Sequence, residues 1–291
     1  MSTALLTDRY ELTMLDAAMR SGTYDRECVF EVFSRRLPDG RRFGIVGGTG
    51  RLLELISEFR FGDAELAWLR ANHVVGADAL DWLAAYRFAG DISGYREGDA
   101  FFPGSPILTV DGTFAEAVIL ETLVLSVLNY DSAVASAAAR MVSAAEGRPL
   151  SEMGSRRANE SAAVAAARAA YIAGFGATSN LAAGSRWGIP TMGTAAHSFT
   201  LLHDSEEEAF RLGRDDRDLF RPGRLDGLLV RIDHRHPLPD HLADGAIVRR
   251  DPFRERRCRR RGVGRDEDEV FWLGVNGQDR LRPGRLDELL V

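Results

Sequence analysis

The sequence contains no lysine, and all 37 of its basic residues are arginine. It therefore has no side-chain amine for a Schiff base, for a Walker-type phosphate loop or for a lysine general base. Any phosphate must be held by arginine side chains, backbone N–H groups and helix N-termini. A bias in codon composition is the simpler cause of this absence, and the chemical exclusion holds in either case.

Cysteine is also scarce, with only Cys28 and Cys258 in the chain. Two cysteines are too few for a disulfide framework or a cysteine zinc cluster, and they fit a reducing cytoplasm. No run of about 18 apolar residues lacks charge, and charged residues already occur close to the start. We therefore expect a cytoplasmic protein with neither a signal peptide nor a membrane-spanning helix.

Charge of one sign does not dominate the chain, whose formal net charge is −6. This balance gives no general attraction to nucleic acid or anionic lipid. The distribution is uneven, because residues 1–210 hold 18 arginines and 27 acidic residues whereas residues 211–291 hold 19 and 16. The second region has little apolar periodicity, and its interspersed acidic residues argue against a nucleic-acid-binding tail.

Apolar periodicity predicts a mixed front part and then alternating helices and strands, which is typical of a parallel α/β fold. Near the start, Asp8 could cap a helix with Leu12, Leu15 and Met19 on one face. We expect an N-terminal domain over residues 1–113, a second domain over 114–210 and a poorly ordered arginine-rich tail over 211–291. The predicted helices are 51–59, most of 64–88, 115–145 and 159–173, and the predicted strands are 28–33, 91–95, 107–110 and 188–192.

His197 lies in the segment GTAAHSF, directly after a predicted strand. The carboxyl ends of strands are where α/β sheets usually place their chemistry. A histidine there, beside hydroxyl groups, could be a general base or a phosphate acceptor. Judged alone, a structural histidine is the simpler interpretation.

Two further segments have the features of anion sites. Arg156 and Arg157 end the segment EMGSRR, in a glycine-containing turn before a helix, where paired guanidinium groups suit a diphosphate. Thr178 and Ser179 lie in GFGATSN, whose small residues, hydroxyls and backbone donors are typical of an anion nest. The alternatives are a solvated basic turn for the first segment and an ordinary helix cap for the second.

Other patterns are weaker. Tyr10, in TDRYELT, is an aromatic residue that core packing can explain. Histidines near His234 are flanked by Asp233, but their spacing matches no zinc site, and we predict no metal site. The segment GGTG at residues 47–50 lacks the third glycine of a dinucleotide-binding fingerprint.

In order along the chain, from Leu5 to about Phe210, these segments resemble nicotinate phosphoribosyltransferase, especially its actinobacterial form. The segments that carry the resemblance are TDRYELTM at Thr7, FEVFSRRLP at Phe30, FPGSPIL at Phe102, AEAVILETLVLS at Ala115, SAAARMVSAAEGRPLSEMGSRR ending at Arg157, AARAAYIAGFGATSNLAAG at Ala166 and GIPTMGTAAHSF at Gly188.

The resemblance implies the type II phosphoribosyltransferase fold, an N-terminal α/β domain packed on an irregular α/β barrel. It implies an enzyme of NAD salvage that joins nicotinate to 5-phosphoribosyl-1-diphosphate, giving nicotinate mononucleotide and diphosphate. ATP hydrolysis is coupled to this reaction, and Mg²⁺ accompanies the phosphates. His197 falls on the family's histidine that ATP phosphorylates. Arg156 falls on a substrate-contacting arginine, with Arg157 beside it.

The same resemblance implies how the pyridine ring is held. Ser179, next to Thr178, falls in the turn that receives the ring's carboxylate, where the related nicotinamide enzyme carries an acid. A hydroxyl suits an anionic carboxylate better than an acid does. Tyr10 falls on an aromatic residue that stacks on the ring across a dimer interface, so a homodimer with shared active sites is implied.

The pattern departs from the family after about residue 210. The sequence VRID at Val230 resembles the start of the family's Arg-Ile-Asp-Ser-Gly-Asp segment, which makes Arg231 and Asp233 candidate substrate-binding residues. No counterpart of the glycine-rich phosphate-binding segment is found, so we expect an incomplete barrel in a truncated or altered chain. The alternative function is an inactive homologue that serves as a dimerisation partner.

Overall fold

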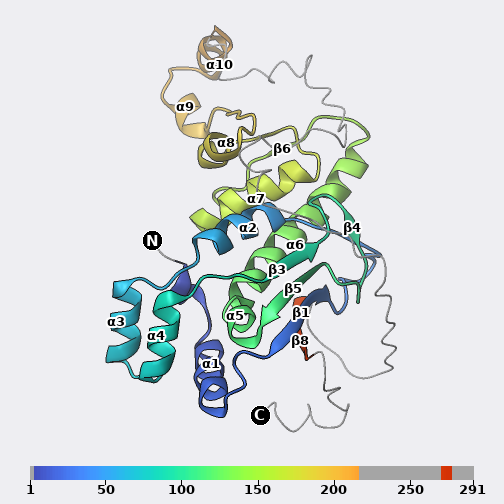
Figure 1. Ribbon diagram of the computed structural model, residues 1–291. Coiled ribbons are helices and arrows are strands. Elements are labelled where there is room, and N and C mark those ends of the chain that lie inside the picture. The colour runs from blue at the N-terminus through green and yellow to red at the C-terminus, as the bar shows by residue number, and fades with distance from the viewer. Residues whose placement is uncertain (1–2, 216–269, 277–291) are drawn as a thin grey trace. The chain divides into compact units, whose positions relative to one another are not determined.

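The computed structural model describes residues 3–215 and 270–276 (Figure 1). The chain divides into two compact units, one of Met1–Asn129 with Ala246–Val291 and the other of Tyr130–Gly245. The division falls within the long helix α6 (Glu121–Ala145). The domain limits at residues 113 and 210 given by the sequence analysis stay predictions.

The first unit is built on a four-stranded sheet in the order β3-β5-β1-β8, in which every neighbouring pair is antiparallel. Burial alternates along β1, with Cys28, Phe30 and Val32 inside, as expected for a strand with one face on the core. The strands of the unit are β1 (Glu27–Ser34), β3 (Asp91–Gly94), β5 (Leu108–Thr113) and β8 (Val270–Asn276), and a separate pair is formed by β2 (Gly44–Ile45) and β4 (Ala100–Phe101).

Strand β8 comes from the arginine-rich tail and pairs with β1, from Cys28 opposite Asn276 to Ser34 opposite Val270. The apolar pattern of the sequence did not predict this strand. Charged residues before it concealed a short run of β-branched and aromatic residues, which favour strands. The pairing makes β1 an inner strand of the sheet. The tail also holds the end of helix α10 (Glu206–Asp215), and its residues 216–269 and 277–291 lie outside the described residues.

Helix α1 (Arg9–Ser21) has the position and the buried face that its apolar spacing predicted, with Leu12 and Leu15 buried. Asp8 occupies the N-cap position with an extended backbone, but its side chain makes no capping hydrogen bond. The helix ends at Gly22, whose φ of 69° is the left-handed conformation that closes many helices.

The other α-helices of the first unit fall within or close to the predicted helical runs, but the runs 64–88 and 115–145 are each divided in two, and the short helix η1 was not predicted. The division of the second run follows α5, which Thr113 caps by accepting a hydrogen bond from Glu116 N at 3.3 Å. α3 and α4 lie side by side (Figure 1). These helices are η1 (Ala4–Leu6), α2 (Thr49–Glu58), α3 (Asp63–Ala71), α4 (Ala77–Ala85) and α5 (Phe114–Val118).

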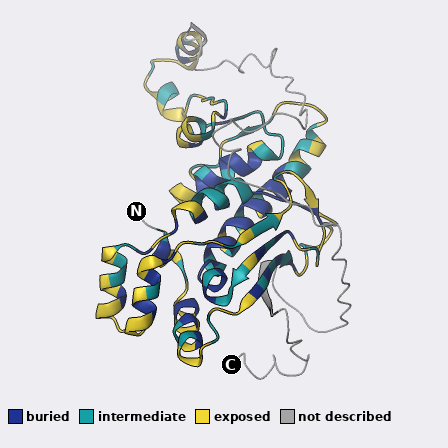
Figure 2. Cartoon of the chain, in the orientation of Figure 1, coloured by how far each residue is buried: buried dark blue, intermediate teal, exposed yellow. Residues whose placement is uncertain are grey.

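The core of the first unit collects side chains from α1, α4, the sheet and the first half of α6 (Figure 2). Leu15, Val32, Leu83, Val110 and Leu128 are each no more than 1% exposed. Among the described residues, α6 is the one helix long and apolar enough to cross a membrane, and half of its apolar window is buried inside the structure. A core helix passes that test of length and composition equally well.

The second unit alternates strand and helix, as the sequence predicted. β6 (Ser151–Glu152) and β7 (Ala177–Thr178) are parallel, and α7 (Glu160–Ile172) connects them. A third parallel segment is reduced to one bridge, between Thr178 and Thr191, so the strand predicted over residues 188–192 is shorter than expected. The helices that follow are α8 (Leu181–Trp187), α9 (His197–Leu201) and α10 (Glu206–Asp215).

Alanine lets α7 pack closely in this unit. Ala167 of α7, Ala183 of α8 and Ile189 form a small buried cluster. The start of α7 is fixed by Asn159, whose side chain accepts hydrogen bonds from the N–H groups of the first turn. The cap and the contacts between small residues thus fix the helices that pack against the short strands.

Candidate active site

Three of the segments with predicted chemistry begin at the ends of neighbouring strand segments in the second unit. Glu152 of β6 lies opposite Thr178 of β7, and Thr178 bridges to Thr191. Because the carboxyl ends of parallel strands lie at the same edge, the loops that follow them start next to one another. These loops carry Arg156, Arg157, Ser179 and, at the start of α9, His197.

Backbone hydrogen bonds hold these strand ends together. The N–H of Ser179 donates to the carbonyl of Glu152 at 2.8 Å. On the other side, the N–H of Thr178 donates to Pro190 O at 2.9 Å, and its carbonyl accepts from Met192 N at 3.0 Å. The turn after β7 is therefore fixed between the two neighbouring segments.

The two hydroxyls predicted to contact substrate have different surroundings. Thr178 is fully buried, and its Oγ1 donates to Glu152 Oε2 at 2.7 Å and accepts from Asn180 N at 3.0 Å. Ser179 is partly exposed. Thr178 thus supports the turn from inside, whereas Ser179 is the hydroxyl that solvent can reach. A direct contact of either residue with substrate stays a prediction.

Asn180 joins the turn to two other elements. Its Oδ1 accepts from Ala183 N at 2.9 Å and caps α8, as the alternative interpretation of this segment expected. Its Nδ2 donates to Ser155 Oγ at 3.0 Å, which reaches the loop after β6. The residues following β6 and β7 therefore form one connected surface within the second unit.

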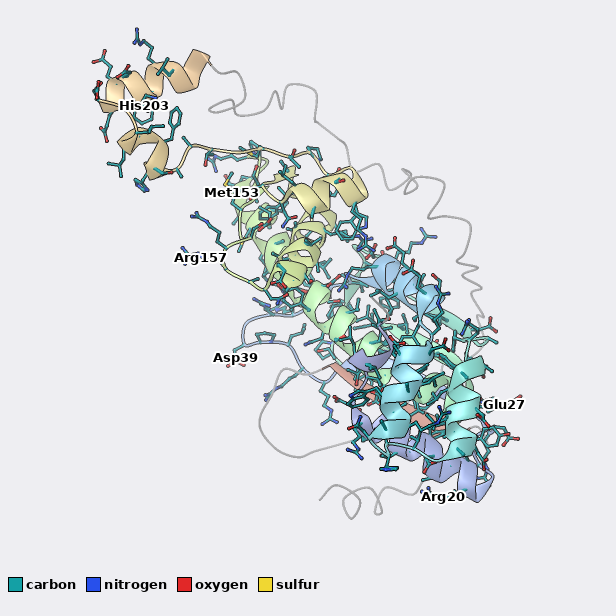
Figure 3. The ribbon with its side chains drawn as sticks, turned by 90° about the vertical axis from the view of Figure 1, so that its left-hand side faces the viewer. Arg20, Glu27, Asp39, Met153, Arg157 and His203 are labelled. Atoms are coloured by element: carbon teal, nitrogen blue, oxygen red, sulfur yellow. The ribbon has the colours of Figure 1, made fainter. Side chains whose placement is uncertain are left out.

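Arg156 and Arg157 lie in an exposed turn that Arg157 N closes by donating to Gly154 O at 2.8 Å. Figure 3 shows Arg157 and Met153 in this region, at the surface of the second unit. Neither arginine is paired with a carboxylate among the described residues. Two guanidinium groups that are not engaged by acids can bind an oxyanion from solvent.

His197 is the first residue of α9 and is exposed. Its exposure does not fit the alternative of a histidine packed in the core. Thr191, which takes part in the parallel bridge, lies six residues before it in the chain. His203, just after α9, has its Nδ1 within hydrogen-bond distance, 2.7 Å, of Phe199 O. An exposed imidazole can accept or donate a proton, or accept a phosphoryl group.

Tyr10 belongs to the first unit and is 44% exposed on α1, so core packing does not account for it. Its hydroxyl donates to Glu121 Oε1 at 2.8 Å. Partial burial, followed by the bond to Glu121, raises the pKa of Tyr10 above its ordinary value. The phenol therefore stays protonated at neutral pH and keeps its role as a donor.

Glu11, one turn from Thr7, is a functional candidate that sequence reasoning missed. It is fully buried, and burial raises the pKa of Glu11 to about 7. Its Oε1 accepts from Thr122 N at 2.8 Å and from Thr122 Oγ1, and its Oε2 accepts from Thr7 Oγ1. The signal in the sequence is the spacing of Thr7 and Glu11 by four residues, but only the structure shows the burial.

Arg231, Asp233 and the histidines near His234 lie outside the described residues, so their predicted roles stay predictions. Within residues 3–215 and the β8 segment, no group of three or more His, Cys, Asp or Glu side chains could hold a metal ion. The candidate site is therefore made of arginine, hydroxyl, histidine and backbone groups.

Residues 5–129 match the family model described as nicotinate phosphoribosyltransferase (NAPRTase) N-terminal domain. These residues belong to the nicotinate phosphoribosyltransferase family. The resemblance found in the sequence is thereby confirmed. The second unit lies beyond the matched residues and is compared through individual relatives.

Curated relatives extend the similarity into the second unit. The chain is 65% identical over 199 residues to nicotinate phosphoribosyltransferase pncB1 of Mycobacterium tuberculosis, covering 68% of this chain and 44% of the relative. It is 35% identical over 211 residues to nicotinate phosphoribosyltransferase of Bacillus subtilis, covering 72% and 43%. The chain therefore spans less than half the length of these relatives.

Solved structures give the same fold. The human nicotinic acid phosphoribosyltransferase has a TM-score of 0.63 at 33% identity, covering 67% of this chain and 40% of that chain. A nicotinate-nucleotide pyrophosphorylase from Pyrococcus furiosus has a TM-score of 0.58 at 22% identity, which supports the fold alone. The predicted fold class, an α/β type II phosphoribosyltransferase, is confirmed.

Proposed function

We propose that the chain carries the substrate-binding surface of a nicotinate phosphoribosyltransferase, which joins nicotinate to phosphoribosyl diphosphate and releases diphosphate. The observation that supports this most strongly is the parallel pairing of Glu152, Thr178 and Thr191. The three loops that carry the proposed anion-binding residues begin where these strand segments pair. The names of the relatives agree with this reaction.

Arg156 and Arg157 are proposed to take the diphosphate. The departure of diphosphate develops negative charge, and two guanidinium groups in a turn can stabilise that charge with bidentate hydrogen bonds. Ser179 is proposed to receive the carboxylate of nicotinate, because its exposed hydroxyl and the fixed turn around it offer donors without adding negative charge.

His197 is proposed to accept the γ-phosphoryl group of ATP on a ring nitrogen, with release of ADP. Exposure at the start of α9 leaves the ring accessible to a nucleotide. The phosphorylated ring would add negative charge and acceptor oxygens with which the guanidinium groups of the arginine loop could pair. Hydrolysis of the phosphohistidine then returns the histidine to its starting state.

Magnesium is proposed to arrive with the substrate phosphates. Mg²⁺ usually keeps several waters and takes only one or two protein carboxylates together with phosphate oxygens. The lack of a three-residue metal cluster among the described residues is compatible with that mode. Bound in this way, the ion would neutralise charge on the diphosphate.

Tyr10 is proposed to stack on the pyridine ring of a second copy's site in a homodimer, as the family resemblance implies. Its exposure of 44% and its fixed hydroxyl support a ring held in one orientation at the surface. Arg231 and Asp233 are proposed as further substrate-binding residues. We expect the protein to act in the cytoplasm.

Titration calorimetry on the full chain tests the proposed binding surface. We expect phosphoribosyl diphosphate to bind in the presence of Mg²⁺ and an Arg156→Gln, Arg157→Gln double variant to bind it at least about tenfold more weakly. An Arg87→Gln variant, altered in the first unit, should bind normally. Equal affinity in the double variant and the unaltered chain would overturn the role of this loop.

A further inference from the structure

The carboxylate of Glu152 contacts both loops of the candidate site at once. One oxygen, Oε1, accepts a hydrogen bond from Gly154 N in its own loop. The other, Oε2, accepts from Thr178 Oγ1 at 2.7 Å in the neighbouring strand. Gly154 approaches so closely that a Cβ there would lie 2.7 Å from Glu152 Oε1. The side chain therefore ties the start of the arginine loop to the end of β7.

The bonds continue from Thr178 into a closed circuit. Thr178 Oγ1 accepts from Asn180 N at 3.0 Å, and Asn180 Nδ2 donates to Ser155 Oγ at 3.0 Å. Ser155 follows Gly154, so the circuit returns to the loop in which it began. A network of this kind favours one arrangement of the groups it joins, because moving one group breaks bonds to two others.

We propose that Glu152 is a positioning residue, whose carboxylate sets the spacing between the arginine loop and the turn that carries Ser179. This inference rests on the function proposed above. Arg156 and Arg157 would face diphosphate, whereas Ser179 would face nicotinate. The distance between these groups decides whether both substrates can be held in reacting geometry. Displacing a reacting group by about 1 Å can reduce the rate of the chemical step by about a hundredfold.

The charge and shape of Glu152 suit this role better than an amide would. An ionised carboxylate has two acceptor oxygens and no donor, so it can accept from Gly154 N and from Thr178 Oγ1 together. The amide of a Glu152→Gln variant has one acceptor oxygen and can satisfy only one of these donors in the same way. The variant keeps the size of the side chain and breaks the circuit at a single point.

Hydrogen–deuterium exchange on the full chain tests the circuit without any ligand. We expect Glu152→Gln and Thr178→Val each to speed exchange by about tenfold in both segments, residues 153–157 and 178–183, with α10 unchanged. Thr178→Ser keeps the hydroxyl and should restore slow exchange. Glu207→Gln makes the same chemical change at an exposed position of α10 and should alter neither segment. A response in one segment only, or in neither, overturns the inference.

Ligand affinity tests whether the circuit serves the site. We expect Glu152→Gln and Thr178→Val each to lower the affinity for nicotinate and for phosphoribosyl diphosphate by about tenfold. The double variant should bind no more weakly than the weaker of the two single variants. Unchanged affinities together with faster exchange would overturn the positioning role. If the unaltered chain binds neither ligand, the proposed function fails, while the exchange experiment still decides whether Glu152 couples the two loops.

Discussion

The hydroxyl of Tyr10 on α1 donates a 2.8 Å hydrogen bond to Oε1 of Glu121, the first residue of α6. Burial raises the pKa of the Glu121 carboxyl, and the bond from Tyr10 opposes that rise. The bond fixes the direction of an aromatic ring that is nearly half exposed. A ring of this kind can stack on a ligand or pack against the surface of a second protein.

Two substitutions of Tyr10 test the roles of the ring and of its hydroxyl separately. Tyr10→Phe should change the free energy of unfolding by less than about 1 kcal/mol, because the lost bond lies near the surface. Nicotinate affinity should stay nearly unchanged in Tyr10→Phe and fall about tenfold in Tyr10→Ala, which loses the stacking face. Calorimetry measures both affinities. Unchanged nicotinate affinity in Tyr10→Ala would show that this ring does not contact the ligand.

Protonation of Glu11 should make stability depend on pH. Its pKa of about 7 in the folded chain lies above the ordinary value of 4.5, so the folded state binds more protons between these values. The free energy of unfolding should therefore fall as pH rises from about 4.5 to 7, by up to about 1.4 kcal/mol per pH unit. The neighbouring Asp8 and Glu121 carboxylates add to this effect.

The Glu11→Gln variant checks the assignment of that pH dependence. Urea unfolding at several pH values should show a smaller fall in stability with pH in Glu11→Gln than in the unaltered chain. Glu27→Gln, at an exposed position of β1, should retain the original slope. If Glu11→Gln kept the full slope, another group would be responsible.

A negative charge placed at Ser179 should turn the proposed attraction for the nicotinate carboxylate into repulsion. Ser179→Asp should weaken nicotinate binding by at least about tenfold, since two carboxylates would then lie close together. Binding of the neutral nicotinamide should suffer much less, and Ser179→Thr should bind nicotinate almost normally. Equal losses for both pyridines would indicate a distorted turn rather than a carboxylate subsite.

The core position of α6 can be tested through stability. Leu128 is 1% exposed, so Leu128→Ala should lower the free energy of unfolding by about 2–5 kcal/mol. Leu6 is 66% exposed, and Leu6→Ala should change it by less than about 0.5 kcal/mol. Urea denaturation measures both changes. A small effect at Leu128 would contradict its placement in the core.

Local patterns in the sequence predicted most elements of the fold. The helical spacing of Leu12 and Leu15 predicted α1, and the alternation around Phe30 predicted β1, because burial follows the period of each structure. Strand β8 was missed because its pairing with β1 joins residues far apart in the chain. The strand predicted over residues 188–192 was too long, since apolar composition does not show how many residues pair.

The candidate site could be predicted only in part. His197 was singled out by its position after a predicted strand, whereas the arginine pair and Ser179 were singled out by residue type in turns before predicted helices. The bond between Glu152 and Thr178 was not predicted, because a glutamate before a glycine has many possible partners. Burial of Glu11 likewise depends on α6, more than a hundred residues away.

Production of nicotinate mononucleotide by the purified 291-residue chain tests the proposed function most directly. The chain would be supplied with nicotinate, phosphoribosyl diphosphate, Mg²⁺ and ATP, and compared with a His197→Ala variant. We predict product from the unaltered chain, increased by ATP, and no ATP-dependent increase in the variant. A folded chain that forms no product would contradict the proposed activity, and ATP stimulation that persists in His197→Ala would contradict the role of this histidine.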